Sequence, residues 1–386
     1  MIEPKLRFKA DDGSQFPDWE EKTIDEVAEC LDNKRVPVNS EERKKRVGII
    51  PYYGAGGIQG YIDDYLFDEE LVLLLEDGDA FDDFQTKSIA QYITGKSWVN
   101  NHAHVLRANG NSYFLFASLE HKDIRRWTQL AGASRKKLLK DSMLKITVNI
   151  PSLPEQQKIA DFLSTIDTVI EKQKETASAW EERKKGVMQK LFSQKVRFKA
   201  DDGDQFPEWE EKKLGEVFEF YNGKAHENVI SENGKYVVVN SKFISTDGTV
   251  RKYTNEMIFP LIKKDIVMVM SDVPNGKAIS KCFLINENNK YTLNQRICCL
   301  RTKENAVFYI NQISRNKYFL KFDDGVKQTN LRKNDILQCP LLCPCLAEQQ
   351  KIADCLSSLD EVIKKQKATL AAWEELKKGL LQQMFV

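Results

Sequence analysis

Two stretches of the chain carry apolar side chains in alternating steps of four and three residues, the spacing of a coiled-coil seam. The first seam comprises Ile159, Leu163, Ile166, Ile170, Gln173, Ala177, Trp180, Lys184, Val187 and Leu191. The second comprises Ile352, Leu356, Leu359, Ile363, Gln366, Leu370, Trp373, Lys377, Leu380 and Met384. The pattern predicts two paired helices, each about 55 Å long at 1.5 Å per residue.

Gln173 and Gln366 occupy equivalent seam positions. Either the two amides form a buried polar pair that fixes the register, or they face solvent where the seam frays. The connection after the first helix is short, so the body that follows begins at the far end of that helix. This favours antiparallel pairing of the two helices, because a parallel pair needs a longer return connection.

The two helical stretches are copies of each other. Residues 155–186 and 348–379 share 23 identities in 32 positions, and the arms 6–29 and 196–219 share 17 in 24. Two copies are too few for a solenoid and suit an internal pseudo-two-fold repeat. We interpret the copied arms as framework, in which Trp19 and Trp209 pack each arm onto the helices.

Between each arm and its helix lies a body that is not copied. The first body has the strand-like runs VGII, LVLLL and ITVNI and a helix-like stretch near 113–130. The second has YVVVN, DIVMVM and KCFLI and a possible helix around 304–320. Both patterns indicate α+β domains, and the similar fragments at 98–107 and 291–301 suggest one shared fold with different surfaces.

Composition indicates a globular protein without membrane spans. The chain has 386 residues, of which 41% are hydrophobic and 30% charged, and its net charge is +1. No apolar run approaches the roughly 20 residues of a spanning helix, and the N-terminus lacks the apolar core of a signal peptide. We therefore expect a cytoplasmic location.

Catalytic motifs are not evident. GAGGIQG at 54–60 follows no clear strand and opens no helix, so it is not a dinucleotide fingerprint. The acidic run PDWEEK is too compact for a nuclease centre, and there is no nucleophile elbow. Cys339, Cys343 and Cys345 fit buried thiols better than a zinc site, and His102 and His104 lack a partner set. We expect no metal site.

Basic residues mixed with Asn, Gln, Ser and Tyr in turns are candidates for contact with DNA, because such side chains anchor phosphates and read base edges. The alternative is that these residues form an ordinary solvent-exposed charged surface without a role in DNA binding. The candidates are Lys34, Arg35, Arg43, Lys44, Tyr52, Tyr53, Gln59, Lys96, Ser97, Asn101 and His102 in the first body, and Lys224, Asn240, Ser241, Lys242, Asn275, Lys277, Asn294, Gln295 and Lys327 in the second.

The segments PYYGAGGIQGYID, SWVNNHAHVL and LPEQQKIADFLSTID, together with the repeated WEEK arm, resemble the specificity subunit of type I restriction–modification enzymes. The resemblance covers essentially the whole chain. It implies two globular target-recognition domains joined by two long antiparallel coiled-coil helices. The boundaries that we assign are an arm at 1–22, a first recognition domain at 23–150, a central helix at 151–192, a second arm at 193–215, a second recognition domain at 216–345 and a final helix at 346–386.

The resemblance implies a non-catalytic subunit that binds double-stranded DNA, each domain reading one half of a bipartite target. Its partners would be two methyltransferase subunits, docked on the helices, and restriction subunits joined through them. Cofactors would be absent from this chain, with S-adenosylmethionine, ATP and magnesium bound by the partners. The alternatives are a stand-alone DNA-modifying enzyme and a coiled-coil scaffold without base readout.

Overall fold

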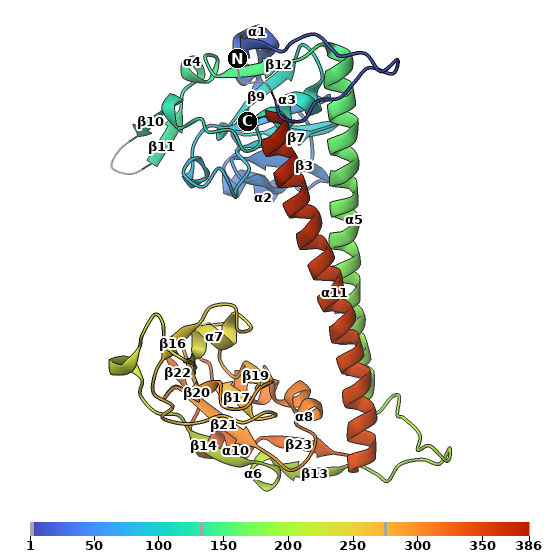
Figure 1. The fold of residues 1–386 in the computed structure, drawn as a ribbon, viewed down its shortest axis with the longest axis vertical. Helices are drawn as coiled ribbons and strands as arrows, with labels where there is room; N and C mark the ends of the chain where they lie inside the picture. Colours follow the sequence, from blue (N-terminus) through green and yellow to red (C-terminus); the bar gives the residue numbers. More distant parts are fainter. Residues whose placement is uncertain (1–3, 132–134, 274–275, 386) are drawn as a thin grey trace. The chain divides into compact units, whose positions relative to one another are not determined.

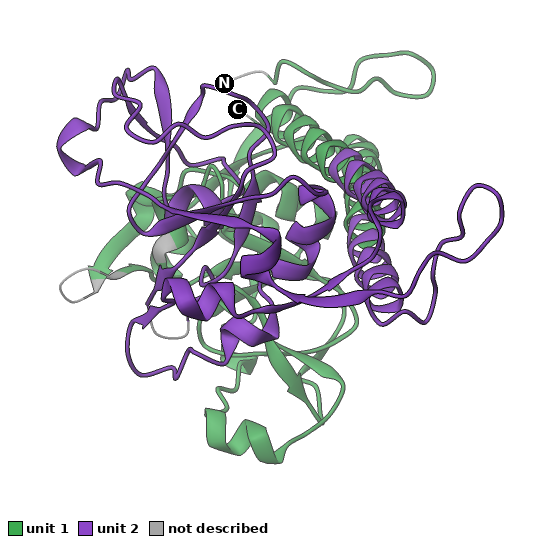
Figure 2. Cartoon of the chain, turned by 90° about the horizontal axis from the view of Figure 1, so that it is seen from below, with its two compact units in different colours: residues 1–176, 366–386 green, residues 177–365 purple. Residues whose placement is uncertain are grey.

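A computed structural model describes residues 4–131, 135–273 and 276–385. The chain divides into two compact units, one formed by Met1–Thr176 with Gln366–Val386 and the other by Ala177–Lys365 (Figure 2). Two 40-residue helices, α5 (Leu153–Phe192) and α11 (Leu346–Phe385), each contribute to both units. Both of these α-helices were predicted from their seams.

Unit 1 is built from two four-stranded sheets and short helices (Figure 1). The first sheet is antiparallel, in the order β2 (Ala28–Cys30), β9 (Ala103–Ala108), β6 (Leu71–Leu75) and β7 (Ala90–Ile93). The second has the order β4 (Gly57–Ile62), β3 (Ile50–Gly54), β8 (Lys96–Val99) and β5 (Phe67–Asp68), with β3 and β8 parallel. The remaining elements are β1 (Glu20–Thr23) paired with β12 (Thr147–Ile150), the hairpin β10 (Thr128–Ala131) and β11 (Arg135–Leu138), α1 (Ile24–Val27), α2 (Ser40–Lys45), α3 (Ser112–Leu119), α4 (Lys140–Met143) and the 3-10 turns η1 (Asp32–Lys34), η2 (Asp79–Phe81) and η3 (Arg125–Trp127).

Unit 2 repeats this arrangement. Its antiparallel sheet has the order β14 (Glu219–Asn222), β21 (Ile297–Arg301), β17 (Ile266–Val269) and β19 (Cys282–Leu284). Its second sheet has the order β16 (Lys252–Thr254), β15 (Tyr236–Val239) and β20 (Tyr291–Leu293), with β15 and β20 parallel. The other elements are β13 (Glu210–Lys213) paired with β23 (Pro340–Cys343), β18 (Ser271–Asp272) paired with β22 (Thr329–Asn330), α6 (Leu214–Val217), α7 (Ser241–Ser245), α8 (Ala306–Ile313), α9 (Lys317–Leu320), α10 (Lys333–Leu337) and η4 (Glu227–Val229).

The central strand of each antiparallel sheet is covered on both faces. In β6 all five residues are buried: Val72 and Leu74 pack with α3, whereas Leu71 and Leu73 pack toward the second sheet. In β17 the four residues alternate in the same way between two apolar clusters. A strand buried on both faces needs a continuous apolar run, which is why LVLLL and IVMV show no polar alternation.

Three expectations about short elements need correction. The helix predicted over 113–130 ends at Leu119, and η3 and β10 follow it. The helix stops there because the carbonyl of Glu120 accepts the backbone N–H of Ile89, in the loop before β7, instead of an N–H of a further helical turn. The helix predicted over 304–320 is split into α8 and α9 at Arg315, whose φ of 55° is left-handed. Of VGII only Ile50 belongs to a strand, β3.

The helices pair antiparallel within each unit. In unit 1 the Gln173 Nε2 donates to the Gln366 carbonyl at 3.1 Å and to its Oε1 at 2.5 Å. The Asp167 carboxylate, further toward the start of α5, binds Lys377, further toward the end of α11, at 2.8 Å. In unit 2 Lys184 binds Asp360 at 2.6 Å. The two glutamines are half-buried and bonded to each other, which resolves the alternative left open by the sequence.

The copied arms hold each unit to its long helix by the same contacts. Arg7 forms a two-pronged hydrogen bond with the fully buried Glu155 of α5, at 3.1 and 2.9 Å. Arg197 and Glu348 of α11 repeat these bonds at the same distances. The side chain of Trp19 packs on Phe114 and Phe385 in unit 1. These contacts explain why the arms and the EQQK motifs are copied together.

Candidate nucleic-acid interface

About half of the sequence-predicted polar residues lie at one equivalent place in each unit, the carboxyl ends of the parallel strand pair. In unit 1 the backbone N–H of Asn100, after β8, donates to the carbonyl of Tyr53, near the end of β3, at 3.0 Å. In unit 2 the N–H of Asn294, after β20, donates to the carbonyl of Val239, at the end of β15, at 3.1 Å. Polar side chains that follow the two strands are therefore brought together.

In unit 1 this edge carries Tyr53, Gln59, Asn101 and His102. The Asn100 amide donates to Gln59 Oε1 at 3.2 Å, and the end of the Gln59 side chain lies close against Gly54, 2.1 Å from where a Cβ would be. Asn101 and Gln59 are exposed. Burial raises the pKa of the Tyr53 phenol, so this group stays neutral and offers a hydroxyl near the edge.

In unit 2 the same edge carries the candidates Lys224, Asn240, Ser241, Lys242, Asn294 and Gln295. The backbone N–H of Lys224 donates to the Leu293 carbonyl at 3.0 Å, which sets Lys224 beside Asn294. Asn240 caps α7 by accepting the Phe243 N–H at 2.9 Å, and Gln295 donates to Glu227. Lys224 and Lys242 are exposed, and this edge is therefore more basic than its counterpart in unit 1.

Arginine and lysine side chains lie over aromatic rings in and next to the second sheet of unit 1. The Arg43 guanidinium is 4.7 Å from the Tyr52 ring centre, and Lys96 is 4.6 Å from that of Tyr65. Arg46, not among the predicted residues, lies 4.5 Å from the Trp98 ring and binds Asp63 at 2.8 Å. The six basic residues in 34–48 were the signal for Arg46, since it belongs to the same run as Arg43.

Three candidates of the first body are unsuited to contact with DNA. Tyr52 and Ser97 are 1% and 0% exposed, and the Tyr52 hydroxyl is bonded to the backbone of Val38, so we correct both to core residues. Arg35 is engaged by Glu76 at 2.6 Å and Asp32 at 3.2 Å and is a structural cation. Lys34 and Lys44 are exposed, although Lys44 is paired with Glu41.

Two further candidates in unit 2 lie apart from the edge. Lys277 and Lys327 are exposed next to the short ribbon of β18 and β22, which the bond from Gln328 to Ser271 at 2.6 Å ties together. Asn275 lies outside the described residues. In unit 1 the hairpin β10–β11 and the turn η3 before it carry Arg125, Arg126 and Lys136, further basic residues that the sequence analysis missed. Their signal was the pair of basic clusters RRW and RKK.

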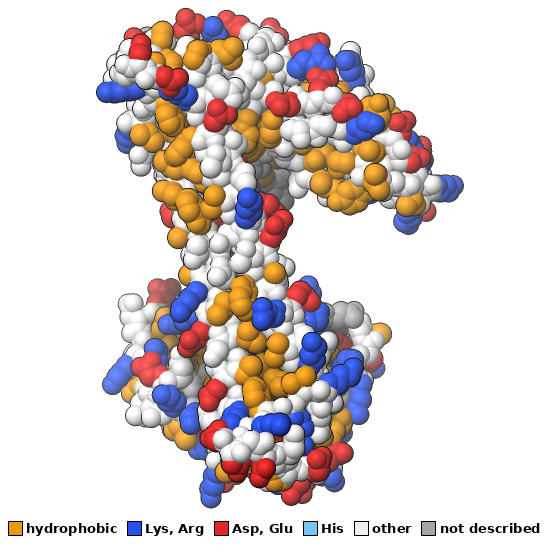
Figure 3. Space-filling model, turned by 90° about the vertical axis from the view of Figure 1, so that its right-hand side faces the viewer, with side chains coloured by type: hydrophobic (Ala, Val, Ile, Leu, Met, Phe, Trp, Pro, Cys, Tyr) orange, Lys and Arg blue, Asp and Glu red, His pale blue; other side chains and the backbone are white. Residues whose placement is uncertain are grey.

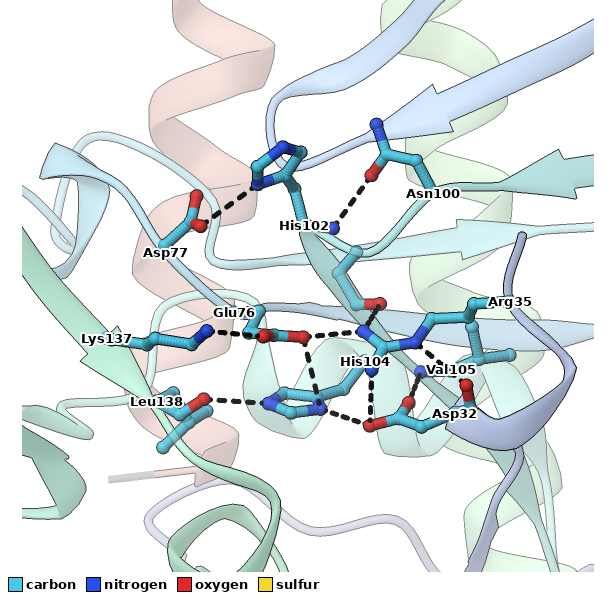
Figure 4. A network of polar contacts seen from close by, with 11 residues as sticks. Asp32, Arg35, Glu76, Asp77, Asn100, His102, His104, Val105, Lys137 and Leu138 are labelled. Atoms are coloured by element: carbon cyan, nitrogen blue, oxygen red, sulfur yellow. Dashed lines mark hydrogen bonds and ion pairs between the residues drawn. The ribbon is translucent and has the colours of Figure 1, made fainter. Parts of the chain in front are cut away.

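A buried polar network anchors that hairpin to unit 1 (Figure 4). His104 on β9 contacts the Asp32 carboxylate through Nδ1 at 2.6 Å and the Leu138 carbonyl through Nε2 at 2.9 Å. Lys137 binds Glu76 at 3.0 Å. Burial disfavours the charge on Asp32, but the hydrogen bond and charge of His104 outweigh this and lower the pKa of Asp32.

Asp32, Glu76 and His104 bring three potential metal-ligating atoms within 4.8 Å of one another. Arg35 and Lys137 already bind the two carboxylates, and both His104 ring nitrogens have partners. The carboxylates and the imidazole nitrogens that could bind a metal are thus already engaged by other groups of the protein. We therefore interpret the network as structural. The thiols of Cys339 and Cys343 are buried, and burial raises the pKa of Cys339 to about 12, which suits unreactive core cysteines.

Comparison with known proteins defines the class. The family of type I restriction modification DNA specificity domains matches this chain twice, at residues 17–177 and at residues 207–372. The chain belongs to this family and is a specificity subunit of the type I restriction–modification class.

Individual relatives agree with this assignment. The MjaVIII specificity subunit of a type I restriction enzyme from Methanocaldococcus jannaschii is 25% identical over 97% of this chain and 94% of its own length. A putative specificity subunit from Haemophilus influenzae, S.HindORF215P, is 40% identical over 157 residues, which is 40% of this chain and 38% of the relative. The crystal structure of a type I S subunit from M. genitalium has the same fold, with a TM-score of 0.64 at 16% identity over 100% of this chain and 99% of the other.

Two general features accompany the assignment. None of the helices among the described residues is long and apolar enough to cross a membrane. On the face in Figure 3, Lys and Arg side chains are interspersed with Asp and Glu rather than gathered in a single basic field.

Proposed function

We propose that each unit reads one half of a bipartite DNA target through the polar edge at the ends of its parallel strands. The observation that carries the proposal is the pairing of a repeated framework with two different edges. Tyr53, Gln59 and Asn101 occupy the edge in unit 1, and Lys224, Lys242 and Asn294 occupy it in unit 2. Amide and ammonium groups suit base edges and phosphates, and different sets suit different sequences.

We further propose that the chain itself is non-catalytic and that methyltransferase subunits, two per chain, dock on α5 and α11. Restriction subunits would join through them, and S-adenosylmethionine, ATP and magnesium would be bound by those partners. Two readers in one chain turn two short recognitions into one bivalent event, so the pair selects a longer target than either alone. The net charge of the chain is only +1, which supports the idea that partner subunits supply part of the nonspecific binding to the DNA backbone.

The test is to exchange residues 23–150 for the corresponding body of another specificity subunit while leaving α5 unchanged. The chimaera is produced with its methyltransferase partner, and the methylated motif is found by methylome sequencing of the host. We expect one half of the motif to change and the other half to persist. An unchanged motif with normal methylation would refute readout by this body.

A further inference from the structure

A cavity of about 780 Å³ opens in unit 1 where the last turn of α11 meets the end of α3 and the β1–β12 pair. Its apolar wall is formed by Phe84, Ala117, Leu381 and Phe385. Its polar rim carries four cationic side chains, those of Lys5, Lys122, Arg126 and Lys378. The size is that of a site for a small organic ligand, and the wall and the rim differ sharply in chemistry.

The cations of the rim are not neutralised by neighbouring carboxylates. Among the residues that the structure describes, no carboxylate lies within 4.0 Å of the Lys122, Arg126 or Lys378 charge. Of the two acidic residues that line the cavity, Asp123 is bound to Arg125 at 2.6 Å, and Glu21 acts on Lys122 only from a greater distance. The neighbouring Lys377 differs, because Glu120 and Asp167 bind it at 3.0 and 2.8 Å.

Lys122 is the key residue because it is half-buried without a counter-ion. Burial lowers the pKa of its ammonium, and the charge of Arg126 acts in the same direction. The Arg126 guanidinium is held over the Trp127 ring at 3.7 Å rather than by an acid. Two cations held close together at the mouth of a cavity create a positive electrostatic potential, and a bound anion would reduce the repulsion between them.

The internal repeat offers a comparison. Lys5, Lys378 and Phe385 have the counterparts Lys195, Lys185 and Phe192 in unit 2, because they belong to the copied framework. Lys122 lies eleven residues after the cap Asn111 of α3, and the same position after the cap Asn305 of α8 is Asn316.

The strand that lines the cavity, β12, also differs from its counterpart in unit 2, β23. Asn149 pairs with Glu21 across β1 and β12, whereas Leu342 pairs with Glu211 across β13 and β23. The backbone of Leu342 is bonded in both directions to Gln312, at 2.8 and 3.1 Å. Of the four cations at the rim, Lys122 and Arg126 therefore come from the body that is not copied, whereas Lys5 and Lys378 belong to the copied framework.

We propose that this cavity binds a phosphate-bearing small molecule of nucleotide size, with its phosphates at Lys122, Arg126 and Lys378 and its ring against Phe84 and Phe385. Ammonium and guanidinium groups are the common protein donors to phosphate, and charge-assisted hydrogen bonds of this kind are the strong ones. An aromatic and aliphatic wall suits a nucleobase, which has an apolar face. The site is distinct from the proposed DNA-reading edge.

The test is isothermal titration of the full-length chain with ADP, using pyrophosphate and adenosine as partial ligands. We expect ADP to bind, pyrophosphate to bind more weakly, and adenosine to bind at least tenfold more weakly than ADP. Lys122→Ala and Arg126→Ala should each weaken ADP binding about tenfold, the loss of one charge-assisted hydrogen bond. Lys122→Arg should retain binding, and circular dichroism of each variant verifies its fold.

Matched controls use the counterpart lysines. Lys185→Ala and Lys195→Ala in unit 2 should leave ADP affinity unchanged. A short DNA duplex distinguishes the two sources of phosphate: if the duplex displaces ADP stoichiometrically, the cavity takes backbone phosphate rather than a free nucleotide and the proposal is wrong. Absence of ADP binding at millimolar concentration, or equal loss with the unit 2 variants, also overturns it. Methylation specificity is a separate readout, so failure here leaves the proposed function untouched.

Discussion

At the scale of single residues, the copied arm is explained by one buried carboxylate in each unit. Glu155 and Glu348 are both fully buried, and an arginine from the arm compensates each of them. The units differ in one respect: Trp209 Nε1 donates to Glu348 at 2.9 Å, whereas Trp19 Nε1 has no hydrogen-bond partner among the described residues. Glu348 is therefore better satisfied than Glu155 when its arginine is removed.

We expect Arg7→Leu to destabilise unit 1 by about 3 kcal/mol, because it leaves a buried charge without its partner. Arg197→Leu should destabilise unit 2 by about 1 kcal/mol less, since the indole hydrogen bond to Glu348 remains. Hydrogen exchange of β1 and β13 measures the two effects separately. Arg7→Lys is the milder control, and equal destabilisation of the two units would contradict the role given to Trp209.

The network around Asp32 gives a prediction about pH. The pKa of Asp32 is lowered in the folded state, so the ionised carboxylate contributes stability above its ordinary pKa of about 3.9, and this contribution is lost as the pH falls through the lowered value. Asp32→Asn should lower the melting temperature at pH 7. Thermal unfolding should show the gap between wild type and variant narrowing below about pH 4. A gap independent of pH would mean that Asp32 acts through shape alone.

The polar candidates were chosen by residue type, because the sequence does not give their positions in the fold. Gln59, Asn101 and Asn294 were chosen because amides in turns suit base edges; the structure places Asn101 after β8 and Asn294 after β20, whereas Gln59 lies within β4. Tyr52 and Ser97 were misjudged because a strand points alternate side chains inward, and a one-residue change in register decides which are buried. The sequence alone does not fix that register.

At the scale of elements, a hydrophobic periodicity that extends over many residues predicted helices more reliably than a short local pattern did. A seam held over more than four heptads leaves little freedom, so both long helices were predicted. The helix expected over 113–130 failed beyond Leu119, because the run of apolar and basic residues there continues as a turn and the strand β10. Tertiary contacts, which local pattern does not contain, decide such ends.

The glutamine pair should behave as a register device. Gln173→Leu alone leaves the half-buried Gln366 amide without its partner and should destabilise the helix pair by about 1 kcal/mol. The double variant with Gln366→Leu should recover that stability, since a leucine pair fills the seam. A double-mutant cycle by thermal unfolding measures the coupling, and additive effects would show that the two amides act independently.

The proposed docking of a methyltransferase on the helices is tested at an exposed helix position rather than in the seam. Ile166 is 6% exposed and packs in the core of unit 1, so a charge there would unfold the unit as well as disturb a partner. Leu376 on α11 is 48% exposed. We expect Leu376→Asp to abolish co-purification with the methyltransferase while circular dichroism stays unchanged, and Leu376→Ala to have a smaller effect. Retained complex formation would exclude this face.

At the scale of the whole chain, one fold is used twice with two different edges. The strand orders of the two antiparallel sheets are equivalent, and so are the parallel pairs of the second sheets. Detailed sequence similarity between the bodies is confined to short fragments, which is why the shared topology could only be suggested from the sequence. The DNA target that each edge is proposed to select depends on loop conformation and DNA shape, so it was beyond sequence reasoning.

Helix length should set the distance between the two halves of the target. Inserting seven residues after Gln173 and seven before Gln366 keeps the heptad register and lengthens each helix by about 10 Å, the span of about three base pairs. Methylome sequencing should then show an unread spacer about three base pairs longer, with both halves unchanged. An unchanged spacer would mean that partner subunits, not the helices, fix the spacing.

The most direct measurement of the central claim is methylome sequencing with the two edges altered separately. One variant carries Gln59→Ala and Asn101→Ala, and the other carries Lys242→Ala and Asn294→Ala. Each should relax one half of the methylated motif only, because removing a side chain that reads a base costs about 1–3 kcal/mol of discrimination at that position. If both variants keep the wild-type motif at full methylation, or if each blurs both halves together, the edges are not the readers.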